Sequence, residues 1–251
     1  MKGMLAAMAR EGHSDSERQK AGAVLRKALN FAVDHGRLAV NPMARVRLPT
    51  PKRPEPVALD REQIRALLAA ADDAGAGHLL RAWVDACLRP AEAMAQQVGD
   101  IDLERGTLSV KRSLDNVTNQ IKTPKTRKSK RTVPLSKSTV ARVRAAVDGK
   151  PAAAPLYPDS RGGHWWLGNF AAKVFRPLVK AAGLSGVKGL SPKALRHTGA
   201  TLLLRSNRVP IKVVSERLGH EDVMTTLRVY SHVLEGDQER AAEVMEELLG
   251  D

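Results

Sequence analysis

Apolar residues recur three or four positions apart along most of the chain, a spacing typical of amphipathic helices. The first such stretch predicts a helix over about 16–35, followed by Gly36 as a C-terminal cap. A second helix is predicted to begin at Asp60, which can form a capping box with Gln63. Further helices are predicted near 77–87, 90–98, 138–147, 168–182, 191–204, 210–219 and 225–230, with a last one whose apolar stripe ends in Leu248 and Leu249.

Strand-like alternation is confined to the middle of the chain. Leu108 and Val110 fall on one face, and their polar neighbours fall on the other. We expect the segments near 120–122 and 131–135 to pair with each other as the arms of a hairpin that carries a basic run at its tip. The fold class predicted by the whole pattern is therefore mainly α with a small antiparallel β-sheet (α+β).

A proline-rich stretch interrupts the helical pattern near the N-terminus. Four prolines lie between Pro49 and Pro56, together with Lys52 and Arg53. Such a composition predicts a stiff basic linker. We therefore place domains at 1–48 and 57–251, joined by a linker over 49–56.

Charge points to the kind of partner. The chain has 41 Lys and Arg against 27 Asp and Glu, a net charge of +14. Six of the ten residues in Lys122–Arg131 are basic, whereas the tail after Leu234 is acidic. A local positive surface favours a polyanionic partner, most often nucleic acid, although composition alone also fits an ordinary basic protein.

The remaining composition bounds the cell compartment. Cys87 is the only cysteine, so an intramolecular disulfide and a cysteine zinc site are excluded, which fits a reducing cytosol. No apolar run reaches the roughly 18 residues of a membrane-spanning helix, and the first ten residues lack a signal-peptide pattern. We expect a cytoplasmic protein.

Four short segments carry chemistry that could act together. Each has an ordinary explanation by itself, because an arginine at a helix start often forms a surface ion pair and a histidine at a helix end often complements the helix dipole. A tyrosine near a helix end is usually packing. The segments are Leu88–Glu92 (LRPAE), Pro124–Thr126 (PKT), Leu195–Thr198 (LRHT) and Leu218–His220 (LGH), the last followed ten residues later by Tyr230.

In order and spacing these segments resemble the tyrosine recombinase (phage integrase) family. The run VVSERLGH at 213–220, continued to Tyr230, is similar to the C-terminal signature of that family, and LRPAE with GDIDL at 99–103 is similar to its first arginine box. The resemblance covers about 57–251 and implies the catalytic-domain fold of DNA breaking-rejoining enzymes. Residues 1–48 resemble only the end of the family's helical (SAM-like) core-binding domain, which indicates a truncated one.

The resemblance implies a role for each position that matches the family's motifs. Tyr230 would be the nucleophile that forms a 3′-phosphotyrosyl bond, Arg89 and Arg196 would clamp the phosphate, and His220 would hydrogen-bond a non-bridging oxygen. Guanidinium groups suit this task because their planar fork matches two phosphate oxygens. The covalent bond conserves the energy of the cut strand, so neither a nucleotide nor a metal or other cofactor is expected. The sequence accordingly has no phosphate-binding glycine loop and no His-Glu-x-x-His motif.

The basic run leaves two residues open for the catalytic lysine. Lys125 is the expected general acid, with Lys122 as the alternative. Lys193 stands where the second arginine box of the family usually has histidine, and it could accept a proton only if its neighbours depressed its pKa. His197 is expected to be structural. The predicted phosphate contacts are Lys111, Arg112, Lys122, Arg127, Lys128 and Lys130.

The function implied is site-specific recombination or integration, most readily that of a mobile element. The expected partner is double-stranded DNA in the nucleoid, bound by a homotetramer on paired sites. The C-terminal helix would pack against a neighbouring subunit or, alternatively, on its own domain. Two other functions stay open: a DNA-binding remnant without recombination, favoured by the short N-terminus and Lys193, and a type IB topoisomerase.

Overall fold

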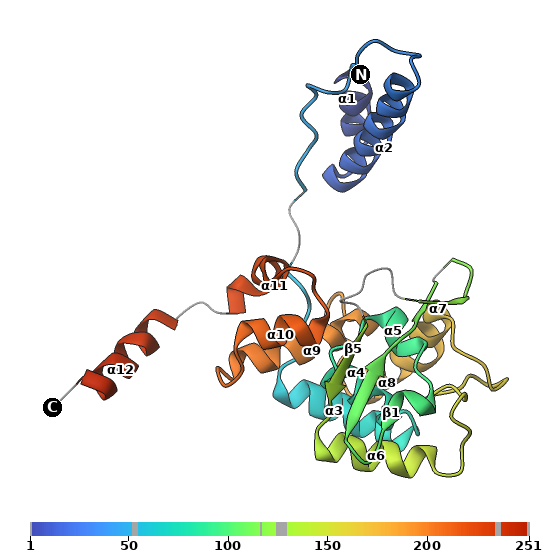
Figure 1. The fold of residues 1–251 in the computed structure, drawn as a ribbon, viewed down its shortest axis with the longest axis vertical. Coiled ribbons are helices and arrows are strands. Elements are labelled where there is room, and N and C mark those ends of the chain that lie inside the picture. Colours follow the sequence, from blue (N-terminus) through green and yellow to red (C-terminus); the bar gives the residue numbers. More distant parts are fainter. Residues whose placement is uncertain (1, 52–54, 116, 124–129, 234–236, 250–251) are drawn as a thin grey trace. The chain divides into compact units, whose positions relative to one another are not determined.

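The computed structural model describes residues 2–51, 55–115, 117–123, 130–233 and 237–249. The chain divides into two compact units, Met1–Glu55 and Pro56–Asp251 (Figure 1). No helix within these described ranges is long and apolar enough to cross a membrane.

The N-terminal unit is a pair of helices with a returning segment. α1 (Lys2–Arg10) leads into α2 (Asp15–Asp34), which begins one residue before the predicted helix does. The reason is a capping box, in which the Ser14 hydroxyl accepts from the Glu17 amide and the Glu17 carboxylate accepts from the Ser14 amide. The segment after α2 then packs back on it, with Leu48 covering Gly22.

The second unit is mainly helical, as predicted. Its first helix, α3 (Arg61–Asp73), has the predicted capping box, because Asp60 Oδ1 accepts from the Gln63 amide and Gln63 Oε1 from the Asp60 amide. The helices that follow are α4 (Gly77–Asp85), α5 (Pro90–Met94), α6 (Lys137–Val147), α7 (Leu167–Phe170), α8 (Arg176–Ala181), α9 (Pro192–Arg205), α10 (Ile211–Leu218), α11 (Val223–Tyr230) and α12 (Asp237–Leu249). The described residues also form the 3₁₀ helices η1 (Val98–Asp100) and η4 (Ser231–Val233) and the π-helix η3 (Ala171–Phe175).

The strands pair differently from the prediction. β5 (Arg131–Pro134) pairs with β2 (Thr107–Val110), which also pairs with β1 (Ile101–Asp102), and all three are antiparallel. β4 (Ile121–Lys122) pairs with β3 (Ser113–Leu114) in a separate two-stranded sheet. The predicted pairing of 120–122 with 131–135 is therefore wrong.

Local contacts explain the hairpin that forms instead. Asp115 accepts from the amides of Val117 and Thr118 and forms an ion pair with Lys122, which closes the turn between β3 and β4. Across the other sheet, Leu108 lies opposite Val133, and both are buried. The strand predicted from the alternation, β2, thus pairs with β5 and not with β4.

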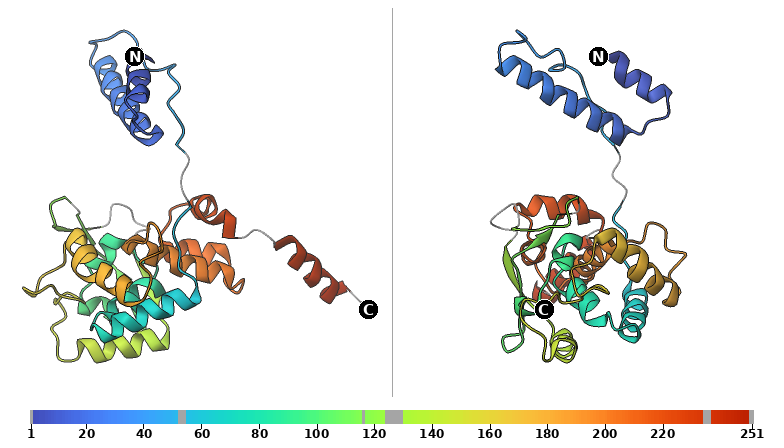
Figure 2. Two further views of the ribbon diagram at one scale, coloured as in Figure 1. Left: turned by 180° about the vertical axis from the view of Figure 1, so that it is seen from behind. Right: turned by 90° about the vertical axis from the view of Figure 1, so that its right-hand side faces the viewer.

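The unit has two buried clusters. The larger joins α3, α4 and α6 to the three-stranded sheet and includes the aromatic residues Trp83 and Phe170. The smaller contains Cys87, Ala200, Leu204, Val214, Leu218 and Tyr230, and it joins α9, α10 and α11. Figure 2 shows the unit from behind, with α6 at the end away from α11. The smaller cluster supports the residues to which the sequence analysis assigned chemistry.

Candidate active site

Arg89 lies at the tight turn between α4 and α5. Its amide donates to Glu92 Oε2 (2.8 Å), its Nη1 donates to Glu92 Oε1 (2.7 Å), and its Nη2 donates to the Gly219 carbonyl (3.0 Å). Cys87 initiates the turn with a φ of 49°, a left-handed conformation that a side chain adopts at some cost. The turn directs Arg89 towards the loop after α10.

Arg196 is buried on α9 and reaches the same loop. Its Nη1 donates to the Cys87 carbonyl (2.8 Å), and its Nη2 donates to the Leu218 carbonyl (2.9 Å) and lies 3.0 Å from His220 Nε2. Gly219 closes α10, as predicted, in the left-handed conformation that lets the chain turn here (φ 65°). The structure thus brings Arg89, Arg196 and His220 together around residues 218–220, although Arg89 and Arg196 are far apart in sequence. Burial, and after it the nearby Arg89, lower the pKa of Arg196 to about 10, so its guanidinium remains charged at neutral pH.

The contacts of His220 define its tautomer. A guanidinium can only donate, so His220 Nε2 accepts from Arg196, and Nδ1 carries the hydrogen that Thr226 Oγ1 accepts at 2.8 Å. Burial, followed by the charges of Arg196, Arg89 and Arg131, lowers the pKa of His220 to about 4. His220 is therefore neutral at physiological pH in the free protein.

A buried ion pair, missed by the sequence analysis, supports this group. Arg131 Nη2 donates to Glu92 Oε2 (3.0 Å), Arg131 Nη1 to Glu92 Oε1 (3.2 Å) and Arg131 Nε to the Arg217 carbonyl (2.7 Å). Burial alone would raise the pKa of Glu92, but Arg131 and Arg89 outweigh it and the pKa is lowered. In the sequence, Arg131 is hidden as the last member of a basic run, and only its position at the start of a strand distinguishes it.

Tyr230 lies inside the smaller cluster. Only 1% of its surface is exposed, and its hydroxyl is 2.8 Å from His197 Nδ1. Burial raises the pKa of Tyr230, and the charge of Arg196 offsets part of this rise. The charge of Arg196 thus stabilises the phenolate form of Tyr230, yet in this conformation the phenol is buried and out of reach of a bound substrate.

The predicted lysines and peripheral arginines lie in varied surroundings. Lys125, Arg127 and Lys128 lie outside the described residues. Lys122 forms an ion pair with Asp115, and Arg112 forms one with the buried Asp100. Lys111, Lys122, Lys130 and Lys193 have exposed side chains, and Lys193 lies one turn before His197 on α9.

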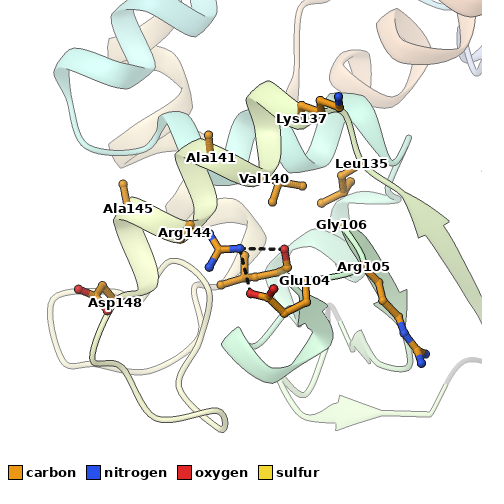
Figure 3. A pocket seen from close by; sticks show the side chains of 11 residues that line it. Glu104, Arg105, Gly106, Leu135, Lys137, Val140, Ala141, Arg144, Ala145 and Asp148 are labelled. Carbon is orange, nitrogen blue, oxygen red and sulfur yellow. Dashed lines mark hydrogen bonds and ion pairs between the residues drawn. The ribbon is translucent and has the colours of Figure 1, made fainter.

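One surface hollow opens onto the site, and a second one does not. One, of about 490 Å³, is lined by Gly219 and His220 and by charged side chains of both signs, namely Lys130, Arg131, Lys212, Glu216 and Glu221, and it leads to the arginine cluster. The other, of about 890 Å³, lies between α6 and the turn that joins β1 and β2, where Arg144 bonds to the Leu103 carbonyl and to Glu104 (Figure 3). No residue to which the sequence analysis gave a role lines this second hollow.

Two half-buried histidines of the site should make stability depend on pH, in addition to the buried His78, whose pKa is also lowered by burial. His197 and His220, each with a pKa of about 4 in the folded chain, take up protons near pH 6.5 only once the chain unfolds. The unfolded state binds more protons in this window, so the free energy of unfolding should fall as pH drops from 7 to 5. The slope is at most about 1.4 kcal/mol per pH unit for each histidine, and less because both are partly exposed.

Urea titrations at pH 7 and pH 5 measure this dependence. His220→Gln keeps an acceptor near the position of Nε2 but cannot titrate, so it should remove a substantial part of the slope. A slope equal to that of the wild-type chain would show that His220 is not neutral in the folded protein.

Comparison with known proteins places this geometry in a family. Residues 58–236 match the model of the phage integrase family. The tyrosine recombinase XerC-like protein of Caldanaerobacter subterraneus subsp. tengcongensis is 30% identical over 269 residues, covering 95% of this chain and 68% of the relative. Tyrosine recombinase XerC of Xanthomonas campestris pv. campestris is 29% identical over 231 residues, covering 89% of this chain and 66% of the relative. The chain thus spans about two thirds of the length of these curated relatives.

Solved structures show the same fold. The Tn1549 transposon integrase in complex with transposon right end DNA has a TM-score of 0.79 at 20% identity, covering 96% of this chain and 84% of that one. A lambda integrase dimer bound to a COC′ core site has a TM-score of 0.67 at 18% identity, covering 91% and 77%.

Fold and family together define an enzyme that cleaves and rejoins DNA strands. The chain belongs to the phage integrase family, whose members are tyrosine recombinases.

Proposed function

We propose that this chain carries out site-specific recombination by attacking a phosphodiester of double-stranded DNA with Tyr230. The observation that carries the proposal is the meeting of Arg89, Arg196 and His220 at residues 218–220, beside the cluster that holds Tyr230. Such a meeting places two permanent positive charges where a phosphate can bind. The DNA-bound Tn1549 and lambda integrases, which share the fold, support DNA as the partner.

The residues would divide the chemistry among them. Arg89 and Arg196 neutralise the non-bridging oxygens while a bond forms between Tyr230 Oη and phosphorus and the bond from phosphorus to the 5′ oxygen breaks. The phenolic proton passes to water, and we assign protonation of the departing 5′ oxygen to Lys125, with Lys122 as the alternative. Lys193 would donate to a phosphate oxygen from the exposed side of α9.

His220 must change its bonding to take part. In the free chain Nε2 accepts from Arg196, and a nitrogen that accepts has no hydrogen to offer a phosphate. We propose that the incoming phosphate takes over the Arg196 donor and stabilises a proton on Nε2, which then donates to a non-bridging oxygen. His220 would therefore gain a proton on DNA binding.

The surrounding basic residues would position the duplex without reading its sequence. Lys111 and Lys130 are exposed, while Lys122 and Arg112 would have to exchange their carboxylate partners for phosphates. The remaining proposed contacts are Arg127 and Lys128. We propose that residues 1–48 add contacts as part of a core-binding domain, joined through 49–56 to a catalytic domain at 57–251.

Assembly and setting are also proposals. We propose a homotetramer on paired sites in the nucleoid, serving a mobile element. In α12 the apolar side chains of Val244, Met245, Leu248 and Leu249 are exposed, which suits packing on a neighbouring subunit.

The test is a covalent adduct mapped to one tyrosine. The chain has two tyrosines, Tyr157 and Tyr230, so the assignment is unambiguous. Lightly nicked genomic DNA from the source organism traps the intermediate, because a nick beside the cut lets the short 5′-hydroxyl strand diffuse away. We expect a denaturant-stable adduct whose peptide carries the nucleotide on Tyr230, retained in Tyr157→Phe and absent in Tyr230→Phe. DNA binding by the wild-type chain without any adduct would favour a DNA-binding remnant instead.

A further inference from the structure

His197 makes the one polar contact that the described residues offer to the hydroxyl of Tyr230. Its Nδ1 lies 2.8 Å from Tyr230 Oη, and the two ring centroids are 5.8 Å apart at 54°. His197 comes from α9 and Tyr230 from the end of α11, so the bond connects two helices of the smaller cluster. Tyr230 shares this buried cluster with Cys87, Ala200, Leu204, Val214 and Leu218.

The charge state of His197 makes the bond a holding contact and not an activating one. Burial, followed by the charges of Lys193 and Arg196, lowers the pKa of His197 to about 4. A neutral imidazole of such low basicity can accept a hydrogen bond from a phenol but is a poor acceptor for its proton. His197 therefore does not generate the phenolate in this conformation.

We propose that His197 is a positioning residue that keeps the Tyr230 hydroxyl in its buried place until DNA engages the chain. A buried hydroxyl without a partner is costly, so the bond to His197 is what makes the apolar cluster an acceptable site for it. Removing the bond favours conformations in which the phenol faces water. The holding itself follows from the contacts of the free protein, whereas its use as a brake on strand cleavage rests on the proposed function.

The experiment reads the exposure of one tyrosine without any DNA. In a Tyr157→Phe background Tyr230 is the only tyrosine, and the rate at which tetranitromethane nitrates it follows the population of open conformations. Tyr157 is suited to this change because its ring packs on Trp165 and Phe170, and phenylalanine keeps those contacts. Mass spectrometry of the peptide that carries Tyr230 gives the rate.

Three forms of residue 197 are compared in this background. His197→Asn places an amide oxygen close to the position of Nδ1 and should nitrate within about twofold of the parent. His197→Leu has nearly the shape of asparagine but no polar atom, and it should nitrate about tenfold faster, the ratio that one lost hydrogen bond of about 1.4 kcal/mol produces. Thermal melts show that each variant is folded, and if His197→Leu is not, His197→Gln, whose amide lies one bond farther out, takes its place.

The proposal would be overturned if His197→Asn nitrated at the same rate as His197→Leu, or as His197→Gln where that variant replaces it. Rescue by asparagine alone cannot come from a residue that merely fills space, since leucine fills the same space. Because the readout needs no cleavage, the two proposals fail separately. If Tyr230 is nitrated at the expected rates but no adduct forms, the strand-transfer proposal is contradicted and the holding role of His197 still stands.

Discussion

Replacing Arg196 by lysine is expected to lower the rate of adduct formation by about 10²–10³, the usual cost of removing one electrostatic donor from a transition state. Lysine keeps the charge but is a single point donor, whereas the guanidinium of Arg196 holds the Cys87 and Leu218 carbonyls and His220 Nε2 at once. The ammonium of a lysine at position 196 can donate to one of these groups and to a phosphate oxygen, but it cannot orient all of the groups at once. Single-turnover adduct formation, measured on the DNA that the wild-type chain attacks, gives the ratio.

The matched control is Arg205→Lys, an exposed arginine in the last turn of the same helix. It should leave the adduct rate within twofold of the wild-type rate. Arg196→Lys should also lose about 1–3 kcal/mol of stability, since it leaves at least one buried carbonyl without its donor, so rates are compared well below both melting temperatures. An Arg196→Lys rate within threefold of the wild-type rate would remove Arg196 from the reaction.

The sequence predicted best those features that depend on near neighbours. The start of α3 follows from Asp60 and Gln63, three residues apart, and the end of α10 follows from Gly219, because caps are satisfied within one turn of helix. These signals are complete in a short window, so the structure could confirm them directly.

Strand pairing could not be predicted in the same way. The segments 121–122 and 131–134 both fit an antiparallel partner, and local pattern does not say which strand each meets. The pairing that forms depends on the contact of Val133 with Leu108 in the core and on the ion pair between Asp115 and Lys122 in the hairpin. The first of these contacts joins residues distant in sequence, and neither is visible in the period of the pattern.

The site was nominated by motif, but its supports were not. The resemblance indicated Arg89, Arg196 and His220, whereas the carbonyls at 87, 218 and 219 that orient the two arginines are backbone groups with no sequence signature. Arg131 was one basic residue among six, and only the fold shows that it pairs with the buried Glu92. His197 was expected to be structural, and nothing in the sequence indicated that it contacts Tyr230.

The contacts that hold Arg196 depend on the close approach of α9 to the end of α4, which leaves no room for a side chain at Gly199. A methyl group at Gly199 would enter the carbonyl oxygen of Val84 and lie 2.9 Å from Cys87 Sγ. Backbone cannot move aside as a flexible side chain can, so Gly199→Ala should destabilise the chain by about 3 kcal/mol. For a unit of this size the melting temperature should fall by about 10 °C.

Gly168→Ala is the matched control, because Gly168 also lies in a helix, α7, and a methyl group there meets nothing within 4 Å. Without a clash, alanine should raise stability by up to about 1 kcal/mol, since it restricts the unfolded chain more than glycine does. Because the two substitutions should change the free energy of unfolding in opposite directions, they separate the effect of the steric clash from that of helix propensity. Where Gly199→Ala still folds, α9 must sit farther from Cys87, whose carbonyl holds Arg196, so adduct formation should fall further than the loss of folded protein explains. A Gly199→Ala chain as stable and as active as the wild type would show that α9 and α4 are not packed this closely and would remove the basis for the placement of Arg196.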